Sequence, residues 1–288
     1  MGDSTASGRL PAATRLGAVR LNAADPARLA GFYRQALGLV PHRRQGETLV
    51  LGAGGEDLLE LAPPRNPGAP GRFAGLYHFC LAVEKREALG WLLKRLLDHR
   101  VPLQGLVDHH MAEALYLADP EGNGVELNWD RPRDQWKPFS VWAEQGNAPL
   151  DAEGLLELAG EKPLKALPTD TRVGHVHLHV PALGPCRDFY CGVLGFDKVF
   201  ELPGQAVFTS AGGYHHHVAF NVWKGPGLSQ ALEGSPGLDH FTVLLPGAGD
   251  LERVLQRVRA AGIPSAEDGA GRLLKDPAGN GVRLAAPA

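Results

Sequence analysis

Short stretches of the chain alternate hydrophobic and polar residues, and each run of alternation ends at residues that form turns. Alternation with a period of two is typical of β-strands that bury one face. The clearest example covers residues 107–126, where Asp119 and Gly122 separate two apolar runs. This pattern predicts a β-hairpin whose turn fixes the register of its strands. Tyr116, before the turn, and Glu126, after it, should then point the same way.

Two segments far apart in the sequence carry the dipeptide Phe-Tyr. It lies at residues 32–33 and 189–190, each time after an alternating run and before a Leu-Gly pair. Glycine readily adopts the left-handed conformation that ends a helix, so each Phe-Tyr is predicted to lie on a short helix. A Gly-Gly pair follows each helix, at residues 54–55 and 212–213, and predicts a hairpin.

Two further segments alternate with these along the chain. They begin with GLYHF at residues 75–79 and with GLDHF at residues 237–241. An amphipathic helix is predicted next, over residues 86–98 in one and 250–261 in the other. Each segment ends in a hairpin, with the sequence DPEGNGVEL or DPAGNGVRL. The order strand, helix and about three strands is therefore expected four times, over nearly the whole chain.

This repeated order resembles the βαβββ module of the vicinal-oxygen-chelate superfamily, which includes glyoxalase, bleomycin-resistance and extradiol dioxygenase proteins. The resemblance implies an α+β fold in which four modules form two cup-shaped mixed sheets, with a metal inside a cup. The spacing over residues 107–126 is similar to the signature of the type I extradiol ring-cleaving dioxygenases. The sequence RPRxxW, from Arg131, resembles the two-domain bacterial catechol 2,3-dioxygenases.

The repeats predict a division of the chain into four parts. We expect a mobile N-terminal tail over residues 1–14, a first domain with modules one and two over residues 15–131, a linker over residues 132–170, and a second domain with modules three and four over residues 171–288. The tail has small and polar residues and lacks the apolar stretch of a signal peptide. In the linker, a helix is expected after Asp151, ended by Pro163 and Pro168.

Composition narrows the function classes. The net charge is -3 and basic residues do not cluster, which argues against a nucleic-acid partner. No apolar run approaches the roughly 18 residues of a membrane span. The 3 cysteines form neither a disulfide framework nor a CxxC site, so a cytoplasmic location is expected. The 12 histidines are many for 288 residues, and they cluster.

In the superfamily that the chain resembles, a metal-ligating histidine lies on the first strand of a module and a carboxylate on the last. The corresponding residues here are Ala18, His78, His175 and His240 on first strands, and Glu126 and Arg283 on the last strands of modules two and four. Ala18 cannot bind a metal and Arg283 repels one, so neighbouring modules would leave both cups incomplete.

Pairing of module two with module three, and of module one with module four, would bring His78, His175 and Glu126 together. Exchange of modules in a homodimer is an open alternative. Two histidines and one carboxylate form the facial triad of non-haem Fe(II) oxygenases. The implied cofactor is therefore Fe²⁺, and the same ligands suit Mn²⁺.

The resemblance also implies tasks for other side chains. Three consecutive histidines are expected on the last strand of module three, and His216 matches the acid–base residue of the extradiol enzymes best, with His217 as the alternative. Tyr116 and His109 match positions that hydrogen-bond the substrate oxygens. His177 and His179 share a face with His175 by their period of two, and either line the pocket or pack in the core.

The implied activity is extradiol cleavage of a catechol-type aromatic diol by O₂. Two other functions stay open: a glyoxalase-type, metal-dependent isomerase or lyase, and a metal-free binding protein of the bleomycin-resistance type. Tyr116, His109 and His216 favour dioxygen chemistry, although a fold alone does not select among these functions.

Overall fold

The computed structural model describes residues 8–66, 68, 71–160, 165–225, 227–269 and 271–287. The chain divides into two compact units. Unit 1 consists of Met1–Val19, Arg65–Tyr77 and His175–Ala288, and unit 2 consists of Arg20–Pro64 and His78–Gly174. Most of modules one and two therefore belongs to unit 2, and most of modules three and four belongs to unit 1.

The first two modules have the expected order of elements. Module one contains β1 (Arg15–Asn22), α1 (Pro26–Phe32), the π-helical η1 (Tyr33–Leu37), β2 (Val40–Gln45), β3 (Thr48–Gly52) and β4 (Asp57–Ala62). Module two contains β5 (Gly75–Val83), α2 (Arg86–Asp98), β6 (Leu103–Asp108), β7 (Ala112–Ala118) and β8 (Gly124–Asp130). Helix α2 has the bounds that the apolar spacing predicts.

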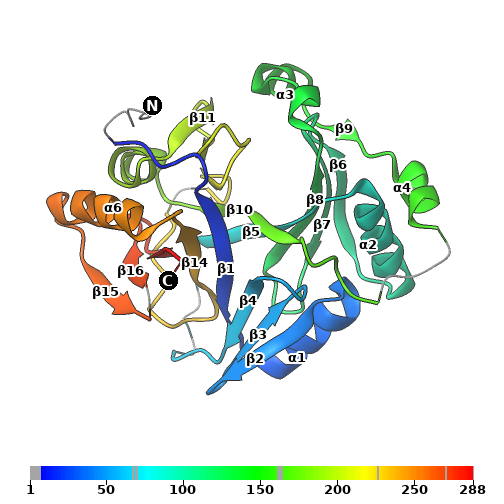
Figure 1. Ribbon diagram of the computed structural model, residues 1–288, viewed down its shortest axis with the longest axis horizontal. Coiled ribbons are helices and arrows are strands. Elements are labelled where there is room, and N and C mark those ends of the chain that lie inside the picture. The colour runs from blue at the N-terminus through cyan, green and yellow to red at the C-terminus, as the bar shows by residue number, and fades with distance from the viewer. Residues whose placement is uncertain are drawn as a thin grey trace. The chain divides into compact units, whose positions relative to one another are not determined.

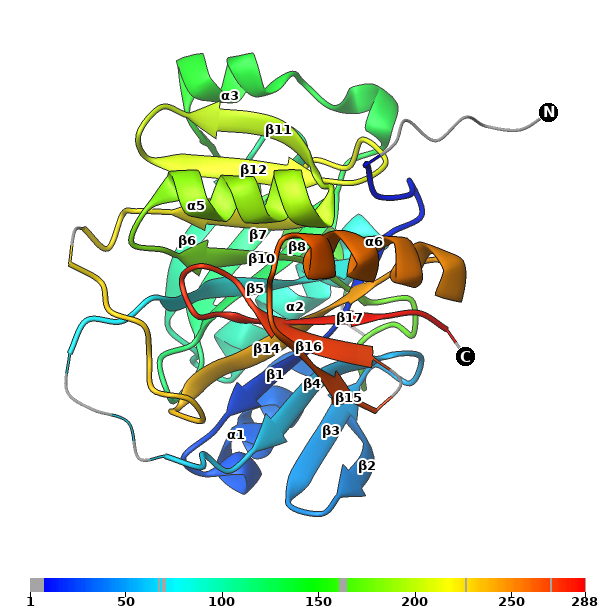
Figure 2. The same ribbon diagram turned by 90° about the vertical axis from the view of Figure 1, so that its left-hand side faces the viewer.

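Modules three and four repeat this order. Module three contains β10 (Arg172–His179), α5 (Leu183–Arg187), the π-helical η3 (Asp188–Leu194), β11 (Asp197–Leu202), β12 (Ala206–Ser210) and β13 (Val218–Asn221). Module four contains β14 (Gly237–Leu244), α6 (Ala248–Ala260), β15 (Ser265–Asp268), β16 (Gly271–Lys275) and β17 (Gly281–Ala285). Figure 2 shows α5 running alongside β12 within unit 1.

The strands have the same spatial order in each module: first, fourth, third, second. The first and fourth strands pair in parallel in modules two, three and four, and the hairpin strands pair antiparallel. Parallel neighbours need a long crossover, which the helix and the hairpin strands provide. The strands belong to two mixed sheets, so the predicted α+β class with βαβββ modules is confirmed.

A buried tyrosine joins the two modules of each unit. The hydroxyl of Tyr33 donates to Asp119 Oδ2 at 2.7 Å, and that of Tyr190 donates to Asp276 Oδ2 at 2.9 Å. Each aspartate also accepts backbone N–H groups of its own hairpin turn. The Phe-Tyr and Asp-Pro motifs are therefore the two halves of one repeated buried contact.

Strands β5 and β10 have residues in both units. Within unit 1, the ring of Tyr77, near the start of β5, lies 4.8 Å from the ring of His179, at the end of β10. Within unit 2, Arg172, at the start of β10, donates to Asp130 at 2.7 Å and lies 3.6 Å from Glu84, next to the end of β5.

The expected tail and linker both contain ordered contacts. Residues 1–7 lie outside the described part of the chain. Within residues 8–14, Arg9 donates to Phe196 O at 3.0 Å and Leu10 N donates to Gly195 O at 2.8 Å. Leu10 is buried in unit 1. These contacts hold residues 9 and 10 against the turn that follows η3.

The segment expected as a linker belongs to unit 2. It contains η2 (Arg133–Gln135), α3 (Phe139–Gln145), β9 (Ala148–Pro149) and α4 (Ala152–Ala159). Strand β9 pairs with β6, and Asp151 caps the predicted helix by accepting from Gly154 N at 3.0 Å. Helix α4 ends before Pro163, which lies outside the described residues. Figure 1 shows α4 beside α2, which it contacts.

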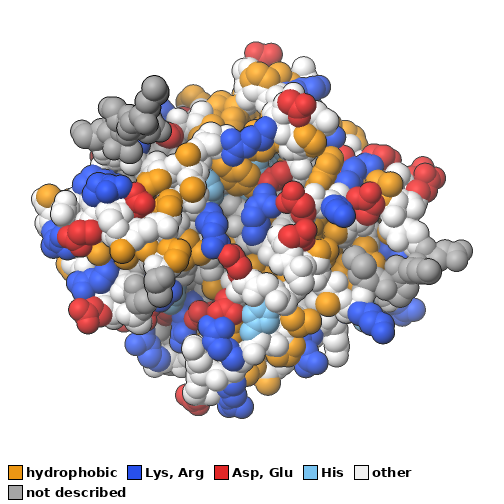
Figure 3. Space-filling model, viewed as in Figure 1, with side chains coloured by type: hydrophobic (Ala, Val, Ile, Leu, Met, Phe, Trp, Pro, Cys, Tyr) orange, Lys and Arg blue, Asp and Glu red, His pale blue; other side chains and the backbone are white. Residues whose placement is uncertain are grey.

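Helix α2 packs closely on α4. A Cβ at Gly90 of α2 would lie 2.1 Å from Leu155 O of α4, so only glycine permits this approach. The longest helices among the described residues, α2 and α6, have 13 residues each, and neither could span a bilayer. On the face shown in Figure 3, acidic and basic side chains are interspersed.

Candidate active site

The hairpin of module two positions the first site residues. Tyr116 on β7 lies directly opposite Glu126 on β8, as the turn predicts. Glu126 is only 2% exposed, and a buried carboxylate is costly without a cationic partner. His78, on the adjacent strand β5, provides one candidate, because its Nε2 lies 3.0 Å from Glu126 Oε2.

The donor set of unit 2 fits a divalent cation. Two ligand atoms bound to one ion at roughly 2.1 Å and at a right angle lie about 3 Å apart. The separation of His78 Nε2 and Glu126 Oε2 has this value, and both side chains are buried. The same geometry also suits an ion pair with a protonated imidazole. A cation or a proton can therefore compensate the charge of Glu126.

Tyr116 and His109 form a hydrogen-bonded pair beside this site. The ring of Tyr116 lies 5.5 Å from that of His78, and its hydroxyl lies 2.7 Å from His109 Nε2. His109 Nδ1 lies 2.8 Å from Asn147 Oδ1, which also accepts the indole N–H of Trp142 at 2.6 Å. No motif in the sequence pointed to Asn147 or Trp142 as site residues, because both belong to the segment expected as a linker.

Unit 1 contains a cluster of histidines around His175. Ligand nitrogens of His175, His215 and His216 lie within 4.8 Å of one another. The ring of His216 lies 4.0 Å from that of His175, and its Nδ1 lies 2.9 Å from His215 Nδ1. His216 is half-buried, whereas His175 and His215 are buried. His216 is thus in contact with His175 and is also partly exposed.

The expectation that these histidines lie on the last strand of module three is wrong. Strand β13 begins at Val218, and residues 215–217 form the preceding loop. Gly212 and Gly213 both have left-handed backbones, and the chain needs further residues to return to the sheet. His217 occupies this return: its Nδ1 accepts from Ala211 N at 3.2 Å, and its ring contacts Phe196.

His177 and His179 share one partner, the buried Asn221. Asn221 Nδ2 donates to His177 Nε2 at 2.9 Å, and Asn221 Oδ1 lies 2.9 Å from His179 Nδ1. The backbone N–H of Trp223 also donates to Asn221 Oδ1, which fixes the orientation of the Asn221 amide. The period of two thus places both histidines on one face as predicted, and Asn221 holds both.

Module four lacks the arrangement of module two. His240 Nδ1 lies 2.8 Å from Asp239 Oδ2, so the carboxylate partner is the sequence neighbour. Arg283 occupies the position in module four that Glu126 occupies in module two, and it lies opposite Leu273. Its guanidinium pairs with Asp268 at 3.0 Å. The partners of His240 and Arg283 account for both polar side chains without a metal.

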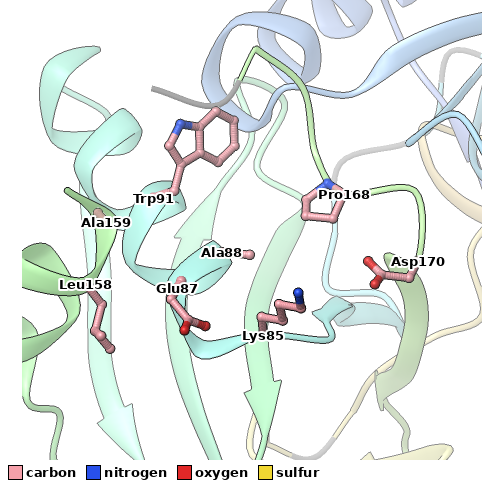
Figure 4. A pocket seen from close by; sticks show the side chains of 8 residues that line it. All are labelled: Lys85, Glu87, Ala88, Trp91, Leu158, Ala159, Pro168 and Asp170. Carbon is pink, nitrogen blue, oxygen red and sulfur yellow. The ribbon is translucent and has the colours of Figure 1, made fainter. Parts of the chain in front are cut away.

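A cavity of about 350 Å³ lies in another part of unit 2, between α2, α4 and residues 168–170 (Figure 4). Its lining consists of Lys85, Glu87, Ala88, Trp91, Leu158, Ala159, Pro168 and Asp170. None of the candidate site residues is among them. The cavity therefore lies apart from the chemistry predicted from the sequence.

The repeated βαβββ modules define the class of protein by its fold, and the buried His78–Glu126 pair is a site that could hold a metal. The chain belongs to the Glyoxalase/Bleomycin resistance protein/Dioxygenase superfamily, whose family model matches residues 15–127 and 172–284. It is 39% identical over 274 residues to the catechol-2,3-dioxygenase of Bacillus subtilis strain 168, covering 92% of this chain and 94% of that protein. The resemblance inferred from the repeats is confirmed.

Solved structures share the fold at low sequence identity. A provisionally named dioxygenase of Bacillus subtilis has a TM-score of 0.66 and 15% identity, with 96% of this chain and 86% of that chain covered. The CppA protein of Streptococcus pneumoniae has a TM-score of 0.57 and 14% identity, with 95% of this chain and 98% of that chain covered. Glyoxalase I of Zea mays has a TM-score of 0.55 and 16% identity, with 94% of this chain and 92% of that chain covered. At these identities the comparison concerns the fold alone.

Proposed function

We propose that this chain is an extradiol ring-cleaving dioxygenase that opens a catechol-type aromatic diol with O₂. The proposed cofactor is one Fe²⁺ ion held by His78, Glu126 and His175, a ligand set that suits Mn²⁺ as well. The observation that carries the proposal is the arrangement around Glu126, which meets His78 on one side and lies opposite Tyr116 on the other. The similarity to a catechol-2,3-dioxygenase supports the same reaction class.

The choice of His175 as the third ligand rests on the repeats. His78 and His175 lie on β5 and β10, the first strands of modules two and three. His240, on the first strand of module four, already has Asp239 as its carboxylate partner.

When bound, the ferrous ion would supply electron transfer between the coordinated diol and O₂. The residues of the chain would move the protons. Tyr116 and His109 would receive a proton from a substrate hydroxyl, because their 2.7 Å hydrogen bond connects the site to an imidazole. His216 would donate a proton to a substrate oxygen and regain one from solvent, to which its half-buried side chain is open.

A metal-dependent isomerase or lyase of glyoxalase type is the second candidate, because maize glyoxalase I has the same fold. The Tyr116–His109 pair favours the oxygenase, since it offers a proton acceptor for a diol hydroxyl. The two candidates differ in one observable quantity, the consumption of O₂.

The deciding experiment uses the full chain loaded anaerobically with Fe²⁺ and then mixed with catechol in air-saturated buffer. We expect a yellow semialdehyde product and uptake of one O₂ per catechol. Absence of both with catechol and with its alkyl-substituted forms would refute the oxygenase. Conversion of a 2-oxoaldehyde–thiol adduct without O₂ uptake would instead support the glyoxalase-type candidate.

A further inference from the structure

Asn147 lies beside His109 although 38 positions separate them in the sequence. Strand β9 pairs antiparallel with β6, and Ala148 lies opposite Asp108. Asn147, the residue before β9, therefore lies opposite His109, the residue after β6. Asn147 Oδ1 consequently lies 2.8 Å from His109 Nδ1. A second contact holds the same loop, because His110 Nε2 donates to Gly146 O at 3.1 Å.

Trp142 determines which atom of the Asn147 amide faces His109. An indole N–H can only donate a hydrogen bond. Trp142 Nε1 lies 2.6 Å from the amide atom that also contacts His109, so this atom must be the carbonyl oxygen. An amide oxygen only accepts, and His109 must therefore donate to it. The proton of neutral His109 lies on Nδ1.

This tautomer decides the direction of the next hydrogen bond. With its proton on Nδ1, neutral imidazole has a lone pair on Nε2. His109 Nε2 lies 2.7 Å from the hydroxyl oxygen of Tyr116, so Tyr116 donates and His109 accepts. The phenol oxygen keeps lone pairs with which it can accept a second hydrogen bond.

We propose that Asn147, oriented by Trp142, is the positioning residue that keeps His109 Nε2 ready to receive the Tyr116 proton. The proposal rests on the proposed function. The proton of a substrate hydroxyl moves to the Tyr116 oxygen while the Tyr116 proton moves to His109 Nε2, without a change of oxidation state. The resulting imidazolium donates one N–H to Tyr116 and the other to Asn147.

Charged groups near His109 are paired among themselves. Asp108, its sequence neighbour, accepts from Arg131 at 2.7 Å, and Glu113 accepts from Arg131 at 2.9 Å and from Arg86 at 2.7 Å. His110 is engaged with Gly146 O. The uncharged Asn147 therefore controls the tautomer of His109 through direct hydrogen bonding.

The test reads the tautomer directly. Metal-free, full-length protein labelled with ¹⁵N-histidine is examined by long-range ¹H–¹⁵N correlation NMR, and the His109 signals are identified by their loss in His109→Gln. Wild type should show the Nδ1–H form. Asn147→Leu should lose it, whereas Asn147→Asp should keep it, because a carboxylate oxygen also accepts from Nδ1.

Turnover of catechol provides the second readout. In Asn147→Leu, kcat should fall about 10- to 100-fold with KM nearly unchanged, as for other residues that orient a catalytic imidazole. Asn147→Asp should restore most of kcat. Trp142→Phe should produce a mixture of tautomers and an intermediate kcat, because the amide can then rotate.

Trp136→Phe is the matched control. Trp136 lies in the same segment and its indole donates to Arg131 O at 2.6 Å, so the variant should leave both readouts unchanged. An Nδ1–H form retained in Asn147→Leu, or lost in Asn147→Asp, would overturn the proposal. If wild type failed to cleave any catechol, the NMR result would still decide the tautomer, and the oxygenase alone would fail.

Discussion

At the scale of single residues, His78 and His240 occupy the same position in two modules but have different carboxylate partners. Both lie on the first strand of a module and both are buried. Nε2 of His78 meets Glu126 from another strand, whereas Nδ1 of His240 meets its sequence neighbour Asp239. The carboxylate partner therefore comes from another strand in one case and from the adjacent residue in the other.

This difference predicts unequal effects of one substitution at the two positions. His78→Gln should weaken Mn²⁺ binding by about 10- to 100-fold or more and abolish catechol cleavage, since a metal ligand is lost. His240→Gln should leave both within about threefold. Calorimetric titration of each variant with Mn²⁺ and turnover by the Fe²⁺ form provide the measurements. Equal losses in the two variants would show that His78 has no special role.

Tyr116→Phe tests the proton acceptor. The substitution retains the ring contact with His78 and removes the hydroxyl that His109 accepts from. We expect kcat for catechol to fall about 10²-fold with KM little changed, a loss typical of general acid–base residues. Steady-state kinetics at saturating O₂ decide this, and a kcat within twofold of wild type would contradict the assigned role.

At the scale of elements, each unit depends on a buried tyrosine–aspartate contact between its two modules. Burial and the neighbouring carboxylate of Asp119 raise the pKa of Tyr33 well above its ordinary value, so the phenol stays protonated and donates. Burial likewise raises the pKa of Tyr190, which donates to Asp276. The contact fixes each π-helix against a hairpin turn from the other module.

Tyr33→Phe should therefore destabilise the protein by about 1–3 kcal/mol, because a buried carboxylate loses a donor. Urea unfolding followed by tryptophan fluorescence measures the change. Tyr77→Phe is the control: its side chain is 40% exposed, and we expect a change below about 0.5 kcal/mol. Equal effects of the two substitutions would refute a special contribution from the Tyr33 hydroxyl.

Asp57, at the start of β4, gives the module-one hairpin a predictable acid sensitivity. Burial alone would raise the pKa of Asp57, but hydrogen bonds from Arg43 and His42 outweigh this effect and hold the pKa below its ordinary value. A lowered folded-state pKa contributes stability that is present above the unfolded pKa and is lost as the pH falls through the folded one.

Asp57→Asn should thus be less stable than wild type by up to about 1 kcal/mol near neutrality. The difference should shrink as the pH falls through and below the ordinary titration range of an aspartate, where Asp57 becomes protonated in wild type. Urea unfolding of both proteins across this range provides the comparison. A difference that does not change with pH would exclude ionisation of Asp57 as the cause.

At the scale of the whole molecule, the repeats vary in their polar residues while keeping one strand order. Glu126 on the fourth strand of module two meets His78, whereas Glu60 on the fourth strand of module one pairs with Arg20 at 3.0 Å. The same strand position therefore carries a glutamate paired with an arginine in module one and a glutamate paired with a histidine, the proposed metal ligand, in module two. Metal binding should depend on Glu126 and not on Glu60.

Anaerobic addition of Fe²⁺ or Mn²⁺ should raise the unfolding temperature by a few degrees, because an ion at a hundredfold excess over its Kd stabilises the folded state by about 2.7 kcal/mol. Scanning fluorimetry should show the shift in wild type and in Glu60→Gln, and its loss in Glu126→Gln. A shift that persists in Glu126→Gln would place the ion elsewhere.

Local sequence patterns correctly predicted those elements whose contacts join residues close together in the chain. The bounds of α2 and the pairing of Tyr116 with Glu126 agree with the structure because both follow from short-range spacing. The strand expected at His216 starts later, at Val218, because the turn before it uses two left-handed glycines and a longer return. Asn147 was missed, since its approach to His109 depends on the β6–β9 pairing.

The sequence by itself determined the repeated module, and through its resemblance to a known superfamily it indicated the family and a set of candidate metal ligands. The module follows from hydrophobic periodicity and turn-forming residues, which act between residues close together in the chain. Only the tertiary structure decided that His78 meets Glu126 while His240 meets Asp239, and that an asparagine and a tryptophan fix the proton of His109. Such contacts join residues far apart in the chain, and strand pairing creates them only when the sheet forms.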